Sequence, residues 1–360
     1  MPAIHTRPPA LIVRAGRRAL ERVREQGLRP EDVHVIPGAA GGPKALGLSG
    51  LDRAIFGEWL ARAPQERSLI GSSIGSWRFA AVASSEDPAA QLAKLAELYT
   101  CQRFSKGVSP AEVTRKSTLF LEELIGGREQ AILEHPWYRL SIVVVRSLAG
   151  LEDDTRGRLG LGLMKAISAN MVSRRHLGRF FERGIIHDRR LPAPLAKLVD
   201  FPSHQVPLTR ENLIPALLAS ASIPLVMSGV RNIPGAPQGV YRDGGLLDYH
   251  LDLPYQQPGV VLYPHFTDKV VPGWFDKTLP WRRGDAGRLQ DVVLVAPSRA
   301  YLDSLPDRKL PDRKDFERYA GDDPGRERTW RTAIARSERL GEEFLELVDS
   351  GRVQEVLQPL

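Results

Sequence analysis

Short runs of apolar residues alternate with longer amphipathic segments along the whole chain. The short runs are rich in Val, Ile and Leu and end in turn residues, as buried strands do. The longer segments repeat apolar residues three and four positions apart, which is the spacing of one helix face. The pattern predicts strands at 33–36, 68–70, 141–145, 240–242, 260–263 and 292–296. It predicts helices at 11–26, 45–59, 77–83, 88–99, 110–124, 161–182, 212–222 and 326–357.

The order of these elements indicates an α/β fold. Apolar strands that alternate with helices are typical of a mainly parallel sheet with helices on both faces. We therefore expect a three-layer sandwich around a mainly parallel central sheet, with functional groups at the carboxyl ends of its strands. The 28 prolines and 32 glycines are dispersed. This predicts one domain with insertions, without repeats or an interdomain linker.

Composition narrows the functional classes. The chain has 50 basic and 43 acidic residues, a net charge of +7, and the two signs are interleaved as on a solvated surface. No recognition motif accompanies the charge, so we expect no nucleic-acid partner. The single cysteine, Cys101, excludes an intramolecular disulfide, and no Cys/His set has metal-site spacing. The first ten residues lack the apolar core of a signal peptide, so we expect a cytoplasmic protein.

The sequence Gly-Ser-Ser-Ile-Gly at 71–75 has the pattern of a nucleophile elbow. It follows a short predicted strand and precedes a predicted helix, and a serine on such a sharp turn has a strained backbone. Gly71 and Gly75 would then stand where a Cβ would collide with neighbouring backbone. The helix amino end would point at the Ser73 hydroxyl and favour developing negative charge there. Ser73 is therefore a candidate nucleophile.

A glycine-rich turn at 38–44 follows the first predicted strand. Its backbone N–H groups could form an oxyanion hole for acyl transfer. A phosphate loop requires Gly-Lys followed by Ser or Thr, whereas this turn reads Pro43-Lys44-Ala45. The glycine spacing also fails the dinucleotide fingerprint. Nucleotide binding is therefore the weaker interpretation of this turn.

A third motif, Asp243-Gly244-Gly245, follows the predicted strand at 240–242. Two glycines allow the backbone to turn closely after the carboxylate. A serine nucleophile needs a base, and a partly desolvated carboxylate within hydrogen-bond reach can fill that role directly. Asp243 is therefore the candidate base for Ser73.

In order and spacing, these three motifs and the run Ala-Ser-Ala-Ser-Ile-Pro at 219–224 resemble the patatin-like phospholipases. The resemblance covers residues 33–248. It implies an α/β fold with a Ser-Asp dyad and no catalytic histidine, acting on lipid acyl esters. It assigns the nucleophile to Ser73, the aspartate to Asp243 and the oxyanion hole to Gly41, Gly42 and Lys44.

On this interpretation the chain has three parts. Residues 1–32 form an N-terminal helical extension, 33–300 the patatin-like acyl hydrolase domain, and 301–360 a C-terminal helical segment packed on the same domain. The chemistry requires no metal and no organic cofactor. The expected partner is a lipid or ester substrate, and peripheral contact with a membrane surface through Arg174, Arg175 and Arg179 is one option beside a solvated helix face.

The glycine turn departs from the family pattern Gly-Gly-Gly-x-Arg-Gly. Ala40 replaces the first glycine, Lys44 the arginine and Ala45 the last glycine. Pro43 stands at the variable position and has no N–H to donate. These changes motivate an alternative in which the protein is a catalytically silent lipid-binding or regulatory protein on the same fold.

A second alternative is an α/β-hydrolase triad, with Ser73, Asp243 and either His250 or His265. Its elbow normally follows several strands, and here only one clear strand precedes residue 68. Other polar residues have simpler structural interpretations: we expect loop hydrogen bonds, packing or surface positions for Asp248, Asp252, His34, His135 and Cys101.

Overall fold

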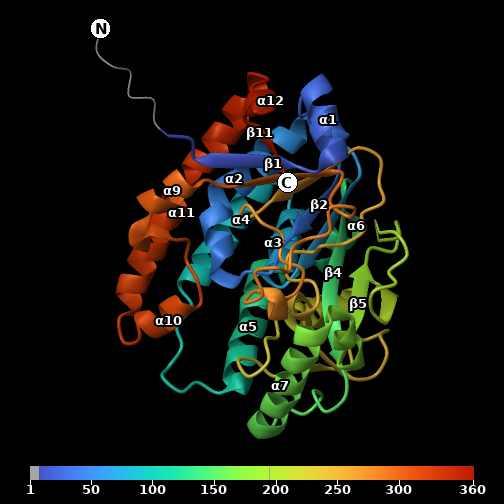
Figure 1. Cartoon of the computed structure of the whole chain (residues 1–360). Coiled ribbons are helices and arrows are strands. Elements are labelled where there is room, and N and C mark those ends of the chain that lie inside the picture. The colour runs from blue at the N-terminus through green and yellow to red at the C-terminus, as the bar shows by residue number, and fades with distance from the viewer. Residues whose placement is uncertain (1–7, 194) are drawn as a thin grey trace.

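An eleven-stranded sheet lies at the centre of the protein (Figure 1). The computed structural model describes residues 8–193 and 195–360. Within these residues the strand order is β11-β1-β10-β9-β2-β3-β4-β5-β6, and β8 pairs with β4 and with β7. The strands are β1 (Leu11–Ala15), β2 (Val33–Gly38), β3 (Arg67–Ser72), β4 (Tyr138–Ser147), β5 (Phe181–His187), β6 (Ser203–Pro207), β7 (Val230–Arg231), β8 (Val240–Asp243), β9 (Val260–Pro264), β10 (Val292–Pro297) and β11 (Leu357–Pro359).

The central strands run parallel. Each neighbouring pair in the series β10-β9-β2-β3-β4 is parallel. Antiparallel pairing begins on either side, where β1 joins β10 and both β5 and β8 join β4. The expected mainly parallel central sheet is therefore confirmed.

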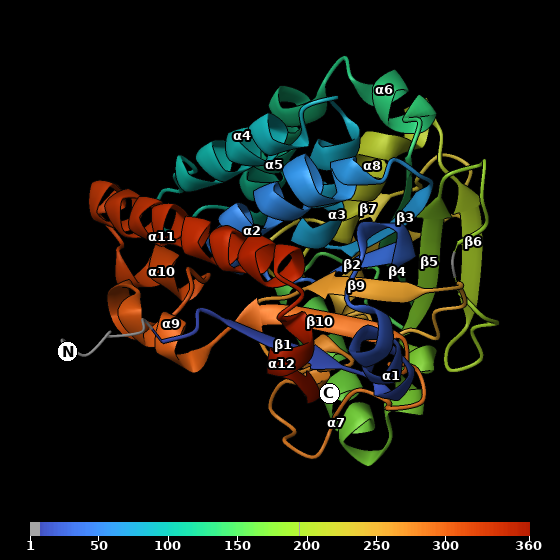
Figure 2. The same cartoon turned by 90° about the horizontal axis from the view of Figure 1, so that it is seen from above.

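Helices cover both faces of the sheet, which gives the expected three layers (Figure 2). One layer contains α2, α3, α4, α5, α8 and α11, and the opposite face carries α1, α7 and α12. The helices are α1 (Arg17–Gln26), α2 (Ser49–Ala54), α3 (Ile74–Ala83), α4 (Pro88–Thr100), α5 (Pro110–Ile125), α6 (Glu129–Glu134), α7 (Arg156–Val172), α8 (Arg210–Ser220), α9 (Arg299–Ser304), α10 (Lys314–Arg318), α11 (Asp323–Asp349) and α12 (Val353–Val356).

The apolar strands form the middle of the core. Every residue of β3, β8, β9 and β10 is buried. Helix α3 is buried along its whole length, so it packs against β3 on one side and the outer helices on the other. Its one charged side chain, Arg78, forms an ion pair with Asp52 of α2, which compensates both buried charges. A helix enclosed in this way gives the strand-to-helix turn at its start a rigid support.

The prediction of a helix at 11–26 is wrong for its first five residues. Leu11, Val13 and Ala15 are buried while Ile12 and Arg14 are partly exposed, the alternation of a strand. This segment is β1, which pairs antiparallel with β10. Gly16 separates β1 from α1 at a close approach, because a Cβ there would lie 1.8 Å from the Leu289 carbonyl oxygen.

Two other expected helices end differently. The helix expected at 161–182 is α7, which stops at Val172; a 3-10 helix and the first residues of β5 occupy the rest. The tail expected at 326–357 is α11 and α12, but the chain then continues into β11, which pairs with β1. In each case a strand at the helix end is stabilised by pairing with a distant segment, which local periodicity does not report.

The division into 1–32, 33–300 and 301–360 stays a prediction, with one correction. The N-terminal part contains β1 as well as α1, so it contributes a strand to the sheet and is not a purely helical extension. Part of the expected extension, and part of the segment that we expect not to be a signal peptide, falls at residues 1–7, which lie outside the described residues.

Candidate active site

Ser73 occupies the turn between β3 and α3, in the middle of the sheet. Its φ of 56° and ψ of −129° are strained values for a residue with a side chain. A Cβ at Gly71 would lie 2.4 Å from the Ser76 nitrogen, and one at Gly75 would lie 1.9 Å from the Gly38 oxygen. Both glycines are therefore required by close backbone approach, as the sequence predicts for a nucleophile elbow.

The serine side chain points at the aspartate of the third motif. Ser73 Oγ donates a hydrogen bond of 2.8 Å to Asp243 Oδ2. The other carboxylate oxygen, Oδ1, accepts the Gly245 N–H at 2.8 Å. Asp243 ends β8, which pairs with β4, the neighbour of β3. Two residues 170 positions apart thus meet because their strands both pair with β4.

Ser220 at the end of α8 holds the elbow from the opposite side. Its hydroxyl accepts the Ser73 N–H at 2.9 Å and donates to the Val143 carbonyl of β4 at 2.7 Å. The Ser222 carbonyl accepts the Asp243 N–H at 3.0 Å. The run at 219–224 therefore connects both residues of the serine–aspartate pair.

Burial changes the acidity of Asp243. The carboxyl group is 5 % exposed, and desolvation raises its pKa from 3.8 to about 6. The positive charge of Arg313 and the hydrogen bonds from Gly245 and Ser73 oppose this rise and keep the pKa from going higher. A carboxylate with a pKa of about 6 is ionised at pH 7 and is a stronger base than an exposed aspartate.

The glycine turn packs directly on this pair. A Cβ at Gly245 would lie 2.8 Å from the Ala40 Cβ, and the Ala40 N–H is already bonded to the Tyr249 carbonyl at 2.9 Å. Gly42 has a φ of 56°, which favours glycine. Gly41 has an extended φ of −171°, but a Cβ there would lie 2.5 Å from the Phe266 ring. Both glycines are therefore needed for this path of the chain.

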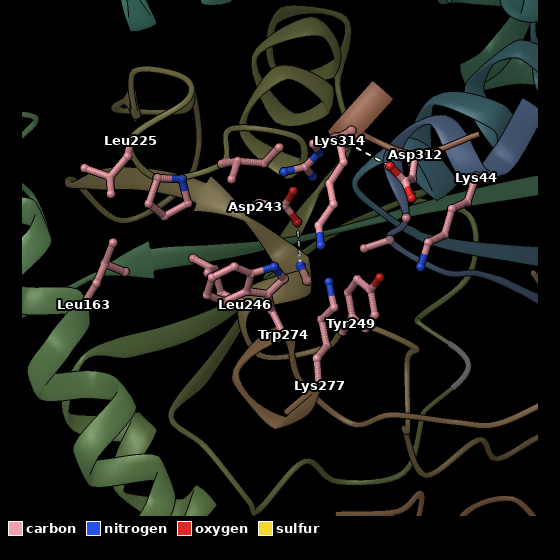
Figure 3. Close-up of a pocket in the computed structure, with 16 residues that line it drawn as sticks. Lys44, Leu163, Leu225, Asp243, Leu246, Tyr249, Trp274, Lys277, Asp312 and Lys314 are labelled. Carbon is pink, nitrogen blue, oxygen red and sulfur yellow. Dashed lines mark hydrogen bonds between the residues drawn. The ribbon is translucent and has the colours of Figure 1, made fainter. Parts of the chain in front are cut away.

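Two cavities open on either side of the pair. One, of about 420 Å³, is lined by Gly41, Asp243 and Lys44 among others. The second, of about 330 Å³, is lined by Gly42 and Ser73 and by apolar side chains of α3, α5 and residues 226–227. Ile223 and Arg313 line both. The larger cavity is apolar on one side of Asp243, at Leu163, Leu225 and Trp274, and basic on the other (Figure 3).

Comparison with known proteins places the motif-bearing segment in a family. The sequence model of the patatin-like phospholipases matches residues 61–250, which is more than half of the chain. The chain belongs to the patatin-like phospholipase family. A search of solved structures matched human GIVD cytosolic phospholipase A2 at 11% identity with a TM-score of 0.35, over 94% of this chain and 62% of that chain. No curated protein sequence matched.

Family membership supports a lipid hydrolase, and the matched segment contains Ser73 and Asp243. The glycine turn at 38–44 lies before it, although the structure packs that turn against Gly75 and Gly245, which belong to the Ser73 and Asp243 motifs. Within residues 8–193 and 195–360, every helix is too short or too polar to cross a bilayer. The same residues offer no group of three or more His, Cys, Asp or Glu side chains arranged to hold a metal ion.

The histidines of the alternative triad have hydrogen-bond partners other than the serine–aspartate pair. His250 Nδ1 accepts the Val271 N–H, and His265 Nδ1 accepts the Thr267 N–H. Their rings contact each other with centroids 4.3 Å apart. Burial lowers the pKa of His265 to about 3 and that of His250 well below its usual range, so both are neutral. Neither forms a hydrogen bond with Ser73 or Asp243 within the described residues.

Other candidate residues of the sequence have structural contacts. Asp248 forms a buried ion pair with Arg183, and Asp252 accepts the Asp285 N–H. Arg174, considered above for lipid phosphates, binds Asp276 and the Leu247 carbonyl. Its positive charge is therefore engaged within the protein, and it is not a free contact for lipid.

Arg313 is the most important residue that the sequence does not reveal. It lies just before α10, far outside the matched segment, and a Cβ at Gly42 would be 3.2 Å from its Nε. It lines both cavities and acts on the pKa of Asp243. The segment around it, 305–313, has no motif that could have signalled this position.

Proposed function

We propose that the protein is a lipid acyl hydrolase in which Ser73 is the nucleophile and Asp243 the base. The observation that carries the proposal is the 2.8 Å hydrogen bond from Ser73 Oγ to a buried carboxylate, at a strained strand-to-helix turn. The family match over residues 61–250 supports lipid acyl esters as the substrate class. The neutral, separately bonded His250 and His265 favour the dyad over a triad.

In the proposed mechanism Asp243 accepts the Ser73 proton while Oγ attacks the ester carbonyl carbon. The N–H groups of Gly41 and Gly42 then stabilise the negative oxygen of the tetrahedral intermediate; Gly41 lines the larger cavity and Gly42 the smaller one. Collapse breaks the ester bond, and the leaving alkoxide takes the proton from Asp243. Water, deprotonated by Asp243, then attacks the acyl-enzyme and releases the fatty acid and free Ser73.

In this mechanism the missing N–H of Pro43 is not required, because the oxyanion is bound by Gly41 and Gly42, which precede Pro43 in the chain. Lys44 extends from the same turn into the larger cavity. Its ammonium group lies 4.7 Å from the Phe266 ring centroid. The retained Ser73–Asp243 hydrogen bond supports an active enzyme over the silent lipid-binding alternative.

Fluorophosphonate labelling tests the proposal, because this reagent reacts with activated serines. We expect labelling and hydrolysis of p-nitrophenyl esters by the wild-type protein, and neither by Ser73→Ala. The matched control Ser76→Ala removes a buried hydroxyl three residues away, whose one hydrogen bond within the described residues goes to the Ser73 carbonyl. Equal labelling of wild type and Ser73→Ala would refute the nucleophile, whereas loss of turnover on His250→Ala or His265→Ala in a folded protein would refute the dyad.

We further propose that the protein meets a lipid surface at the mouth of the larger cavity. Helix α7 exposes Leu161, Met164 and Met171 by about three fifths each (59%, 64% and 62%). Leu225 and Trp274, also exposed, line the cavity itself. An exposed apolar surface continuous with the cavity would let an acyl chain pass from the lipid layer to Ser73 without crossing water.

Flotation with phosphatidylcholine vesicles tests this surface. Met164→Ser and Leu161→Ser together should reduce vesicle binding, because each removes exposed apolar area from the contact. Trp137→Ser is the matched control, since this exposed side chain lies just before β4, at the other end of the sheet. Unchanged binding of the double variant, or equal loss in Trp137→Ser, would contradict the assignment.

A further inference from the structure

Four basic side chains converge on the larger cavity. Lys44 comes from the glycine turn, Lys277 follows Trp274, and Arg313 and Lys314 stand at the start of α10. Figure 3 shows the amino groups of Lys44, Lys277 and Lys314 pointing toward the space beside Asp243 and Tyr249. Three separate segments of the chain thus supply positive charge to one place.

These four cations have no ion-pair partner among the described residues, in contrast to their basic neighbours. Lys309 binds Asp312 and Asp315 at 3.1 and 2.6 Å. Of the two carboxylates in the cavity, Asp312 is therefore engaged by Lys309, and Asp243 is engaged by Ser73 and Gly245.

The aromatic walls of the cavity partly shield its lysines from water, which strengthens the repulsion between their positive charges. Lys44 is half-buried over Phe266, and Lys277 lies 5.0 Å from the Tyr249 ring centroid. Burial and the charges of Lys277 and Arg313 lower the pKa of Lys44 to about 8. Like charges held together in a partly desolvated site repel one another, and a bound anion removes that repulsion. The cluster is therefore a site that a negative ligand would complete.

We propose that the basic side of this cavity binds the head group of the ester substrate, and that this head group carries net negative charge, as in a phosphate monoester of a lipid. The inference rests on the proposed function, which sets the ester carbonyl at Ser73. The phosphate then lies among Lys44, Lys277, Arg313 and Lys314, while the acyl chain lies on the apolar side of the same cavity, at Leu163, Leu225 and Trp274. A phosphocholine group fits less well, because its quaternary amine brings a positive charge into a positive site.

Equilibrium binding tests the site without turnover. The probes are decyl phosphate, decylphosphocholine and inorganic phosphate, titrated by calorimetry into the wild-type protein. Decyl phosphate should bind at least about tenfold more tightly than decylphosphocholine, because one unpaired charge–phosphate contact is worth roughly that factor. Equal affinities would overturn the proposal. Inorganic phosphate binding as tightly as decyl phosphate would overturn the lipid head-group assignment in favour of a free anion.

Charge-neutral variants locate the site. Lys277 and Lys314 are exposed at the mouth of the cavity, so the variants Lys277→Gln and Lys314→Gln should fold as the wild type does. Each should weaken decyl phosphate binding about tenfold by loss of one charge-assisted contact. The matched control is Lys106→Gln, an exposed lysine outside the cavity, which should bind decyl phosphate as the wild type does. Unchanged affinity in both mouth variants would overturn the assignment.

Turnover separates this inference from the proposed function. The wild-type protein should have a higher kcat/KM for oleoyl lysophosphatidic acid than for oleoyl lysophosphatidylcholine or monooleoylglycerol, and the ratio should fall in Lys277→Gln. Hydrolysis of all three lipids at equal kcat/KM would refute the head-group site and leave the hydrolase proposal intact. Tight decyl phosphate binding without hydrolysis or labelling would refute the hydrolase proposal and leave the anion site.

Discussion

Replacing Asp243 by asparagine should stabilise the protein at neutral pH while it removes activity. Burial raises the pKa of Asp243 from 3.8 to about 6, so the folded protein disfavours the ionised carboxylate. Each tenfold change in proton affinity is worth about 1.4 kcal/mol, so ionisation of this group above pH 6 costs about 3 kcal/mol of folding free energy. The asparagine side chain carries no charge and avoids that cost.

The size of this stabilisation depends on pH. A carboxyl group whose pKa is raised on folding lowers the free energy of unfolding of the protein as the pH rises from about 4 to about 6. Above pH 6 this destabilisation is complete. The advantage of Asp243→Asn should therefore be about 3 kcal/mol at pH 8 and well under 1 kcal/mol at pH 4. For a chain of 360 residues, 3 kcal/mol corresponds to an increase in Tm of about 4 °C. The amide oxygen can still accept the Gly245 N–H, so the turn should be preserved.

Thermal unfolding followed by circular dichroism at pH 8 and pH 4 measures this difference. The matched control is Asp248→Asn, five positions along the chain, which breaks the buried ion pair with Arg183 at 2.6 Å. That variant should be destabilised, by roughly 3 kcal/mol, because a buried guanidinium loses one of its partners. A lower Tm for Asp243→Asn than for the wild type at pH 8, or a Tm difference that does not change with pH, would refute the proposed cost of ionising the buried Asp243.

Three further variants test the site. Gly75→Ala should abolish fluorophosphonate labelling and lower the Tm, since its Cβ would lie 1.9 Å from the Gly38 oxygen; an active, equally stable variant would contradict the elbow geometry. Ser220→Ala should cost about 1–3 kcal/mol in urea unfolding because it leaves the elbow N–H unsatisfied. For a neutral ester, kcat/KM should rise as Asp243 ionises near pH 6, and Arg313→Gln should move this limb to higher pH, because Arg313 lowers the pKa of Asp243; an unmoved limb would exclude the coupling.

The sequence allowed the fold class and the serine–aspartate pair to be predicted because both are encoded locally. Gly71 and Gly75 bracket Ser73 in a strand-to-helix turn, and the two glycines after Asp243 mark a close approach of backbone. Steric requirements of this kind are visible in a few consecutive residues. The structure brings these motifs together because β3 and β8 both pair with β4, and family membership follows from the segment that contains both residues.

The missed features depend on contacts between distant segments. The sequence predicts a helix where β1 lies, because five residues fit both the helix and the strand period, and pairing with β10 decides for the strand. Strand β11 exists only because the C-terminus returns to β1. Arg313 and Lys277 are ordinary surface residues in the sequence, and only tertiary packing places them beside Asp243. The positive charge of this cavity therefore could not be predicted from the sequence alone.

The central claim is that Ser73 is a nucleophile activated by Asp243. The most direct measurement is fluorophosphonate labelling of the wild-type protein, followed by mass spectrometry of the modified peptide, with Asp243→Asn treated in parallel. We expect a single adduct on Ser73 and at least about a hundredfold slower labelling of the folded Asp243→Asn variant, because that variant lacks the general base. An adduct on another residue, or labelling of both proteins at the same rate, would contradict it.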